Sequence, residues 1–220
     1  MKPFTNKNIA ILTTESSWIV PYCKDFKNEL SEQYSVELFF NHKEIDTSYE
    51  VVFILGYTKI ITKEYLNKHQ HNLVVHESDL PEGKGWAPLF WQILEHKNQI
   101  PIVLFEATEK VDDGIIYLKD YIELDGSELN HEIRLKQAKA TFKLCLSFLE
   151  SYEELKPYKP IGKESYYSKR GPENSKLDIH KTIEEQFNLL RIVENNEYPA
   201  FFEIMGKKYK IKIEPYETPE

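Results

Sequence analysis

Short apolar runs alternate with helical stretches over the first 76 residues, and this alternation constrains the fold more than any other feature. Runs of about five residues that are rich in β-branched side chains are typical of buried strands. Such runs lie at 9–13, 36–40, 51–55 and 72–76, and helical spacing is found at 18–30 and 60–67. Strands separated by helices predict an α/β fold with a doubly wound, mostly parallel sheet of the Rossmann kind.

The second part of the chain predicts a different arrangement. Residues 102–106 and 115–121 flank an acidic turn and are expected to pair as strands. The longest predicted helix covers 127–155, and its apolar stripe consists of Ala138, Phe142, Cys145 and Leu149. We therefore expect a first domain over 1–155 and a C-terminal extension over 156–220 that packs on it.

The extension is expected to contain an irregular loop, a helix and a β-hairpin. Thr182 and Glu185 have the spacing of a capping box at a helix start. The predicted apolar stripe of that helix consists of Ile183, Phe187, Leu190 and Val193. Two strands at 200–204 and 208–213 flank a Met-Gly-Lys turn and predict the hairpin.

Composition excludes several classes of function. An apolar content of 41% supports a packed core, and a net charge of −8 argues against a nucleic-acid partner. Cys23 and Cys145 are far apart in sequence, which favours reduced, buried thiols. No apolar run approaches the roughly 20 residues that span a bilayer, so we expect no membrane partner and a cytoplasmic location.

Two polar features are candidates for chemistry. The sequence has no G-x-G-x-x-G, Walker, G-x-S-x-G, H-E-x-x-H or paired C-x-x-C motif, so His76 and the pair Asp112 and Asp113 are what is left. His76 ends a predicted strand, and the aspartates lie in a strand connection. Ligands bind beyond the carboxyl ends of parallel strands, where both features are expected. A structural histidine and an ordinary Asp-Asp-Gly turn are the alternatives.

The loop after His76 favours a binding site. Pro81 stiffens it, while Gly83 and Gly85 allow the backbone to approach a ligand closely. A helix predicted to start near Trp86 directs the positive end of its dipole toward the same place, where it is suited to an anionic group.

Several motifs resemble a known family. HESDLPEGKGW at 76–86 resembles the HxSLLPxxRG loop of formyltransferases that use 10-formyltetrahydrofolate, and VDDGIIYLKD at 111–120 resembles their MDTGPI segment. RGPENSKLD at 170–178 and the segment 186–213 are similar to the tail of short sugar N-formyltransferases, which act on nucleotide-linked amino sugars. The resemblance covers residues 8–213.

The resemblance implies a role for individual residues. It implies a catalytic pair of His76 and Asp112, with Asp113 as the alternative if the alignment shifts by one residue. It implies that the formyl donor, 10-formyltetrahydrofolate, contacts Ser78, Leu80, Pro81, Gly85, Phe105 and Ala107. It implies that the nucleotide-sugar acceptor contacts Lys84, Trp86, Arg170, Asn188 and Arg191, although Asn188 and Arg191 have the alternative of being solvated helix residues. It implies no metal ion.

The chain departs from the family at two positions. Val74 stands where the family has an asparagine, and Lys84 stands where it has an arginine. An asparagine that donates to a developing oxyanion is typically worth roughly 2.7–4 kcal/mol. Protonated His76, a backbone N–H of residues 77–85 or a water molecule is our hypothesis for the replacement, because Asn72 lies too far along the strand.

The resemblance favours formyl transfer to a UDP- or dTDP-linked 4-amino-4,6-dideoxy sugar for surface polysaccharide or flagellin glycan synthesis, with the pseudaminic acid pathway as one setting. The alternatives are the same chemistry on initiator methionyl-tRNA, glycinamide ribonucleotide or water, and a non-catalytic nucleotide-sugar or folate binding protein. The short chain and its negative charge disfavour the tRNA alternative. Whether the protein is a homodimer is left open.

Overall fold

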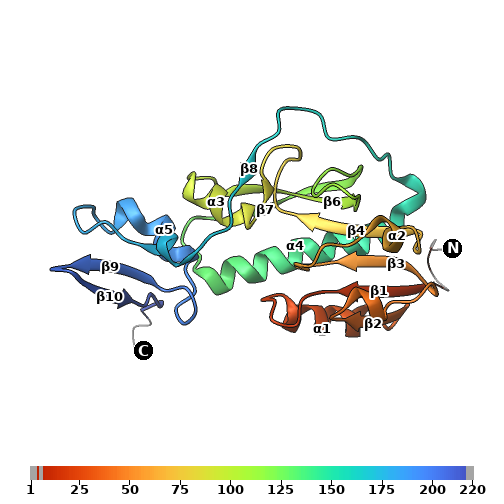
Figure 1. Ribbon diagram of the computed structural model, residues 1–220, viewed down its shortest axis with the longest axis horizontal. Coiled ribbons are helices and arrows are strands. Elements are labelled where there is room, and N and C mark those ends of the chain that lie inside the picture. The colour runs from red at the N-terminus through yellow and green to blue at the C-terminus, as the bar shows by residue number, and fades with distance from the viewer. Residues whose placement is uncertain (1–3, 5–6, 217–220) are drawn as a thin grey trace.

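A six-stranded sheet forms the centre of the structure, a computed structural model that describes residue 4 and residues 7–216. The strands lie in the order β2-β1-β3-β4-β6-β7 (Figure 1). Their bounds are β1 (Asn8–Leu12), β2 (Ser35–Phe39), β3 (Tyr49–Ile54), β4 (His71–His76), β6 (Gln99–Glu106) and β7 (Ile116–Glu123). The α/β fold class predicted from the sequence is confirmed.

The sheet changes direction at β4. Strands β1 to β4 pair in parallel, whereas β6 runs antiparallel to β4 and β7 runs antiparallel to β6. The predicted pairing of 102–106 with 115–121 is therefore confirmed. Strand β1 lies between β2 and β3, so the strand order reverses there, as in other doubly wound sheets.

Two helices cover one face of the sheet. The helical elements are α1 (Val20–Leu30), η1 (His42–Glu44), α2 (Lys63–Leu66), α3 (Pro88–Leu94), α4 (Asn130–Ser151), η2 (Tyr152–Glu154), η3 (Pro172–Ser175), η4 (Glu184–Gln186) and α5 (Phe187–Ile192), where η marks a 3₁₀ turn. α4 lies alongside the strands in Figure 1 and shares the main core with α1. The ring of Phe142 on α4 stacks on Phe26 of α1, with centroids 4.3 Å apart. Phe26 is buried and Phe142 is partly buried, and full burial of such a side chain contributes about 1.5–3 kcal/mol.

Strand alternation divides the apolar residues between two cores. Ile9 and Ile11 of β1 face the main core, while Ala10 and Leu12 face a smaller core beneath α2. The predicted α4 stripe is confirmed, because its other members, Ala138, Cys145 and Leu149, are buried.

Both cysteines are free and buried, as the sequence predicts. Burial raises the pKa of the Cys23 thiol to about 12, so the thiol stays protonated at neutral pH. The described residues hold no group of three or more His, Cys, Asp or Glu side chains suited to a metal ion. Among the same residues, no helix combines the length and apolar character that a membrane span requires.

The extension begins with a segment that crosses the molecule (residues 156–171, the crossing segment; Figure 1). Its strand β8 (Tyr166–Tyr167) pairs in parallel with β5 (Lys84–Gly85), a short strand in the loop after β4. The predicted hairpin lies further along the extension and is formed by β9 (Ala200–Ile204) and β10 (Lys207–Ile211).

The capping box is also confirmed, because the backbone N–H of Thr182 donates to Glu185 and that of Glu185 donates to the Thr182 hydroxyl. The prediction for Ile183 is wrong. Its side chain is 75% exposed, because the turn that follows is a 3₁₀ turn and α5 starts only at residue 187.

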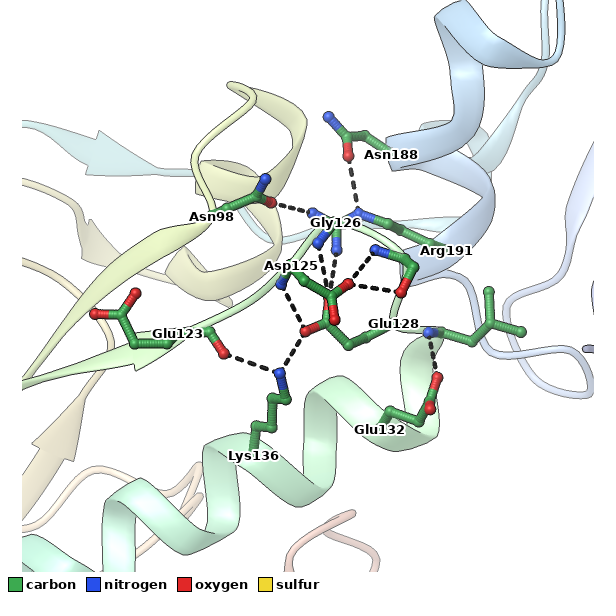
Figure 2. Close-up of polar contacts among 11 residues, drawn as sticks. Asn98, Glu123, Asp125, Gly126, Glu128, Glu132, Lys136, Asn188 and Arg191 are labelled. Atoms are coloured by element: carbon green, nitrogen blue, oxygen red, sulfur yellow. Dashed lines mark hydrogen bonds and ion pairs between the residues drawn. The ribbon is translucent and has the colours of Figure 1, made fainter.

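A buried arginine joins the extension to the rest of the protein (Figure 2). The side chain of Arg191 on α5 is fully buried, and its Nη2 donates to Asn98 Oδ1 at 2.8 Å. Its Nη1 lies 3.4 Å from Glu128 Oε2, and its Nε donates to Asn188. Glu128 also accepts hydrogen bonds from Lys136 and from two backbone N–H groups before α4. This network ties α5 to the loop between β7 and α4.

Replacing Arg191 with Met should lower the free energy of unfolding by about 3 kcal/mol, because breaking a buried ion pair leaves its partner partly uncompensated. Urea denaturation measures this loss. The matched control is Lys139→Met, which removes a cation from an exposed position of α4 and should change stability by less than about 0.5 kcal/mol. Equal stability of the two variants would show that the network does not anchor the extension.

Candidate functional site

His76 is the last residue of β4 and is buried. Both edges of this strand are paired, and His76 itself lies opposite Val103 of β6. The His76 side chain is only 8% exposed, and its Nε2 donates a hydrogen bond to the backbone oxygen of Gly83 at 2.9 Å. This bond places the proton of a neutral imidazole on Nε2 and leaves Nδ1 as a proton acceptor.

Asp112 faces His76 from the connection between β6 and β7. Its Oδ2 lies 3.8 Å from His76 Nε2, and it accepts the backbone N–H of Gly85 at 2.9 Å. The backbone of Asp112 has a φ of +53°, a left-handed conformation that aspartate adopts more readily than most residues. Gly114 is required nearby, because a Cβ there would lie 1.6 Å from the backbone oxygen of Glu106.

The neighbouring aspartate points elsewhere. Asp113 Oδ1 lies 3.2 Å from the ammonium of Lys84, so Asp112 is the aspartate that pairs with the histidine. β6 runs antiparallel to β4, so the carboxyl ends of the two strands point in opposite directions. A shared edge of the sheet therefore does not explain why His76 and Asp112 lie close together. The loop after β4 brings the two residues together through Gly85.

Lys84 is a buried cation that pairs with two carboxylates next to the site. Its side chain is 4% exposed and forms ion pairs with Glu164 at 2.7 Å and with Asp113. Burial lowers the pKa of Lys84, but the hydrogen bonds to Glu164 and Asp113 outweigh it, so that the net pKa is raised and the ammonium stays charged. Lys84 thus links the loop, the β6–β7 connection and the crossing segment.

The expected donor-binding residues fall into two groups. Leu80 and Phe105 pack together with Val103, Ile116 and Val74 in a small apolar cluster, and Pro81 follows Leu80 through a cis peptide bond. Ser78 is buried nearby in the loop, and its hydroxyl has no hydrogen-bond partner among the described residues. Ala107 packs on the core beneath α2, and its N–H donates to the backbone oxygen of Asn72.

Comparison with known proteins shows which family the chain belongs to. Residues 11–147, more than half of the chain, match the formyl transferase family. The chain belongs to the formyl transferase family. This is a family of enzymes whose formyl donors are based on tetrahydrofolate, and His76 and Asp112 lie within the matched region.

The curated relatives match only part of the chain and only part of their own length. A methionyl-tRNA formyltransferase from Caldicellulosiruptor saccharolyticus is 28% identical over 120 residues, which are 54% of this chain and 39% of that protein. The chain spans 27–52% of the length of the first curated relatives that it matches.

Solved structures share the fold. A sugar N-formyltransferase from Shewanella has a TM-score of 0.70 at 15% identity and covers 97% of this chain and 99% of its own. HypX from Aquifex aeolicus, in complex with tetrahydrofolic acid, has a TM-score of 0.78 at 16% identity and covers 93% of this chain and 37% of its own.

The structure shows the surroundings of Val74, the position at which the resemblance implies an asparagine. Val74 pairs with Phe105 and packs against Leu80, so an apolar side chain is accommodated there. Asn72 does not take over the amide, because its Nδ2 donates to the backbone oxygen of Leu66 at 2.8 Å. This agrees with the expectation that Asn72 is too far along the strand.

The residues expected to bind the acceptor do not form one group. Trp86 is 46% exposed and adjoins the site through Gly85, while Arg170 lies over the ring of Trp91. Asn188 contacts His96 and lines a concavity of about 230 Å³ along the extension. The buried guanidinium of Arg191 leaves no surface for a substrate contact, and the two carboxylates on Lys84 compete with a phosphate there.

Sequence reasoning missed a group of hydrogen bonds next to His76 that links the loop after β4 to α3 and α4. The next residue, Glu77, accepts a hydrogen bond from Gln137 on α4 at 2.6 Å, and its backbone oxygen accepts one from Gln92 on α3. Arg134 donates to Gln137, and its guanidinium lies 4.3 Å from the ring centroids of both Trp18 and Phe90. The spacing of Arg134 and Gln137 puts them on one helix face, but no local pattern names Glu77 as their partner.

Gly85→Ala should lower the free energy of unfolding by about 1–3 kcal/mol. Gly85 has a φ of +100°, and a Cβ would lie 2.5 Å from the backbone oxygen of Tyr167, so the loop must move away from β8 and Asp112. Gly171→Ala is the control, because its backbone is extended and a Cβ there meets open space. Chemical denaturation of both variants decides, and an unchanged Gly85→Ala protein would contradict this account of the loop.

Proposed function

We propose that the protein transfers a formyl group from 10-formyltetrahydrofolate to the amine of a nucleotide-linked amino sugar. The observation that carries the chemistry is the buried pair of His76 and Asp112, 3.8 Å apart, within a chain of the formyl transferase family. A UDP- or dTDP-linked 4-amino-4,6-dideoxy sugar is the proposed acceptor, as the tail motifs suggest.

The loop and the neighbouring apolar cluster fit the formyl donor. A folate needs an apolar surface for its ring system and polar groups for its edge. Leu80 and Phe105 are 3% and 1% exposed, so they form an apolar layer beneath the loop, and the hydroxyl of Ser78, which has no hydrogen-bond partner among the described residues, is the proposed polar contact. The donor supplies the formyl carbon, from which the acceptor amine displaces the folate nitrogen.

We propose that His76 accepts a proton from the attacking amine and returns one to the departing folate nitrogen. The attacking amine loses one proton and the departing nitrogen gains one, so a group that accepts and then returns a proton at neutral pH is needed. Nδ1 is free to accept, because Nε2 donates to Gly83. The carboxylate of Asp112 stabilises the resulting imidazolium, which can in turn stabilise negative charge that develops on the formyl oxygen.

The curated relatives favour a second candidate, formyl transfer to methionyl-tRNA, with the same residues in the same roles. The net charge of −8 argues against it, because binding of a polyanion relies on clustered Lys and Arg. The proposed acceptor carries only a diphosphate, which two cations can match.

The direct test is an assay of the purified protein with 10-formyltetrahydrofolate and a panel of nucleotide-linked amino sugars. Mass spectrometry should detect a mass gain of one formyl group on at least one of them. Methionyl-tRNA, glycinamide ribonucleotide and water as acceptors serve as comparisons in the same assay. Formylation of none of the sugars, or faster formylation of another acceptor, would overturn the proposal.

His76→Ala and Asp112→Asn should each reduce turnover by about 100-fold, the loss expected when general acid–base catalysis is removed. The neighbouring residue gives a matched control: Asp113→Asn removes one of the two carboxylates that pair with Lys84 and leaves Asp112 in place, so the loss of turnover should be much smaller. His131→Gln, at an exposed position of α4, controls for the histidine. Turnover that survives Asp112→Asn but not Asp113→Asn would reverse the assignment.

A further inference from the structure

Glu77 follows His76 directly, and its side chain lies on the opposite face of the sheet. Along β4, Val75 packs on the main core, whereas Val74 packs on the apolar cluster of the other face. Because successive side chains of a strand alternate, His76 points to the side of Val74 and Glu77 to the side of Val75. The hydrogen bonds of Glu77 agree with this alternation, since they reach α3 and α4, which both contribute to the main core.

Two buried amide side chains hold Glu77 in place. Its Oε1 accepts a hydrogen bond from Nε2 of Gln137 on α4 at 2.6 Å, and its backbone oxygen accepts one from Nε2 of Gln92 on α3, also at 2.6 Å. Gln137 and Gln92 are each 4% exposed. Hydrogen bonds between buried groups are costly to leave unmade, so these two bonds fix the backbone that follows His76.

Arg134 provides the opposite charge at the end of this chain of hydrogen bonds. Its Nη1 donates to Oε1 of Gln137 at 2.8 Å, so the amide oxygen faces the guanidinium and the amide nitrogen faces the carboxylate of Glu77. The guanidinium carbon lies 4.3 Å from the ring centroids of both Trp18 and Phe90. Burial lowers the pKa of Arg134 to about 10, and the carboxylate of Glu77 acts against this shift. Arg134 therefore stays charged at neutral pH.

The imidazole of His76 has few direct contacts that fix its direction. Among the described residues, its only hydrogen bond runs from Nε2 to the backbone oxygen of Gly83, and Asp112 Oδ2 lies beyond hydrogen-bond distance at 3.8 Å. The direction of the ring therefore depends on the backbone from which it projects. A displacement of about 1 Å at a reacting group can reduce turnover by about 100-fold.

We propose that Glu77, Gln137 and Arg134 are positioning residues for His76. This inference rests on the proposed function, in which His76 accepts and returns a proton. Glu77 does not touch the reacting atoms. It holds the end of β4 against α4, so that Nε2 of His76 stays on Gly83 and Nδ1 stays available to the amine. Arg134 compensates the negative charge that Glu77 brings next to the catalytic histidine.

Steady-state kinetics of Glu77→Ala and Gln137→Met test this role. Each substitution removes the hydrogen bond between the loop and α4, so kcat should fall by about tenfold or more, while KM for 10-formyltetrahydrofolate should stay within about twofold. Glu77→Gln keeps an oxygen that accepts from Gln137 and should largely retain turnover. The controls are Gln99→Met and Glu123→Ala, which break a hydrogen bond of the same kind between β6 and β7, 2.8 Å long, and should leave kcat unchanged.

Nitrogen NMR of the His76 ring gives a second measurement that needs no formyl transfer. The chemical shifts report which ring nitrogen carries the proton, and neutral His76 should carry it on Nε2 in the wild-type protein. In Glu77→Ala and Gln137→Met the bond to Gly83 should weaken, so that both tautomers are populated. His76→Gln assigns the signal, and thermal unfolding verifies that each variant is folded. Glu77→Asp, which keeps the carboxylate but shortens its reach, replaces Glu77→Ala if that variant does not fold.

The outcomes separate this inference from the proposed function. A lower kcat together with altered His76 signals, with Glu77→Gln close to wild type and both controls unaffected, supports the positioning role. An unchanged kcat in Glu77→Ala and Gln137→Met overturns it, and so does a lower kcat with unchanged His76 signals, which indicates a merely structural role. Equal losses in Glu77→Gln and Glu77→Ala also overturn it. If the wild-type protein formylates no acceptor, the proposed function fails, and the His76 signals alone decide the positioning role.

Discussion

The antiparallel pairing of β4 with β6 is the constraint on which the site depends. It sends the carboxyl ends of these two strands in opposite directions, so His76 and the segment carrying Asp112 do not meet at a common edge. The loop after β4 must therefore be held against the β6–β7 connection by its own contacts. The N–H of Gly85 on Asp112 and the ammonium of Lys84 on Asp113 provide them. The restricted Pro/Gly sequence of the loop follows from this need, because only glycine leaves room for Tyr167 at position 85.

The parts of the fold that sequence predicts are those that depend on short-range periodicity. Strands of about five residues, the α4 stripe and the terminal hairpin all follow from the spacing of apolar residues. The antiparallel direction of β6 and the exposure of Ile183 do not follow from it. Strand direction is set by pairing between residues that are distant in sequence, and a 3₁₀ turn changes which side chains share a face.

The candidate site was predictable to a similar degree. The resemblance indicated His76 and Asp112, and the geometry then distinguished Asp112 from Asp113 by their different partners. Arg191 shows where such reasoning stops. Its position on a helix face opposite an apolar stripe is typical of a solvated or substrate-binding residue, yet the structure buries it against Asn98 and Glu128. Those partners come from two other loops, and no local pattern in the sequence brings the three together.

The two arginines of the extension differ in how many of their guanidinium nitrogens have hydrogen-bond partners. Each guanidinium nitrogen of Arg191 has a hydrogen-bond partner, and these contacts hold α5 to the rest of the protein. Arg170 lies over Trp91 and donates to the backbone oxygen of Asn174, and its other terminal nitrogen is buried without a hydrogen-bond partner among the described residues. The extension thus supplies an anchor through Arg191, and its crossing segment supplies Glu164, which pairs with Lys84 next to Asp113.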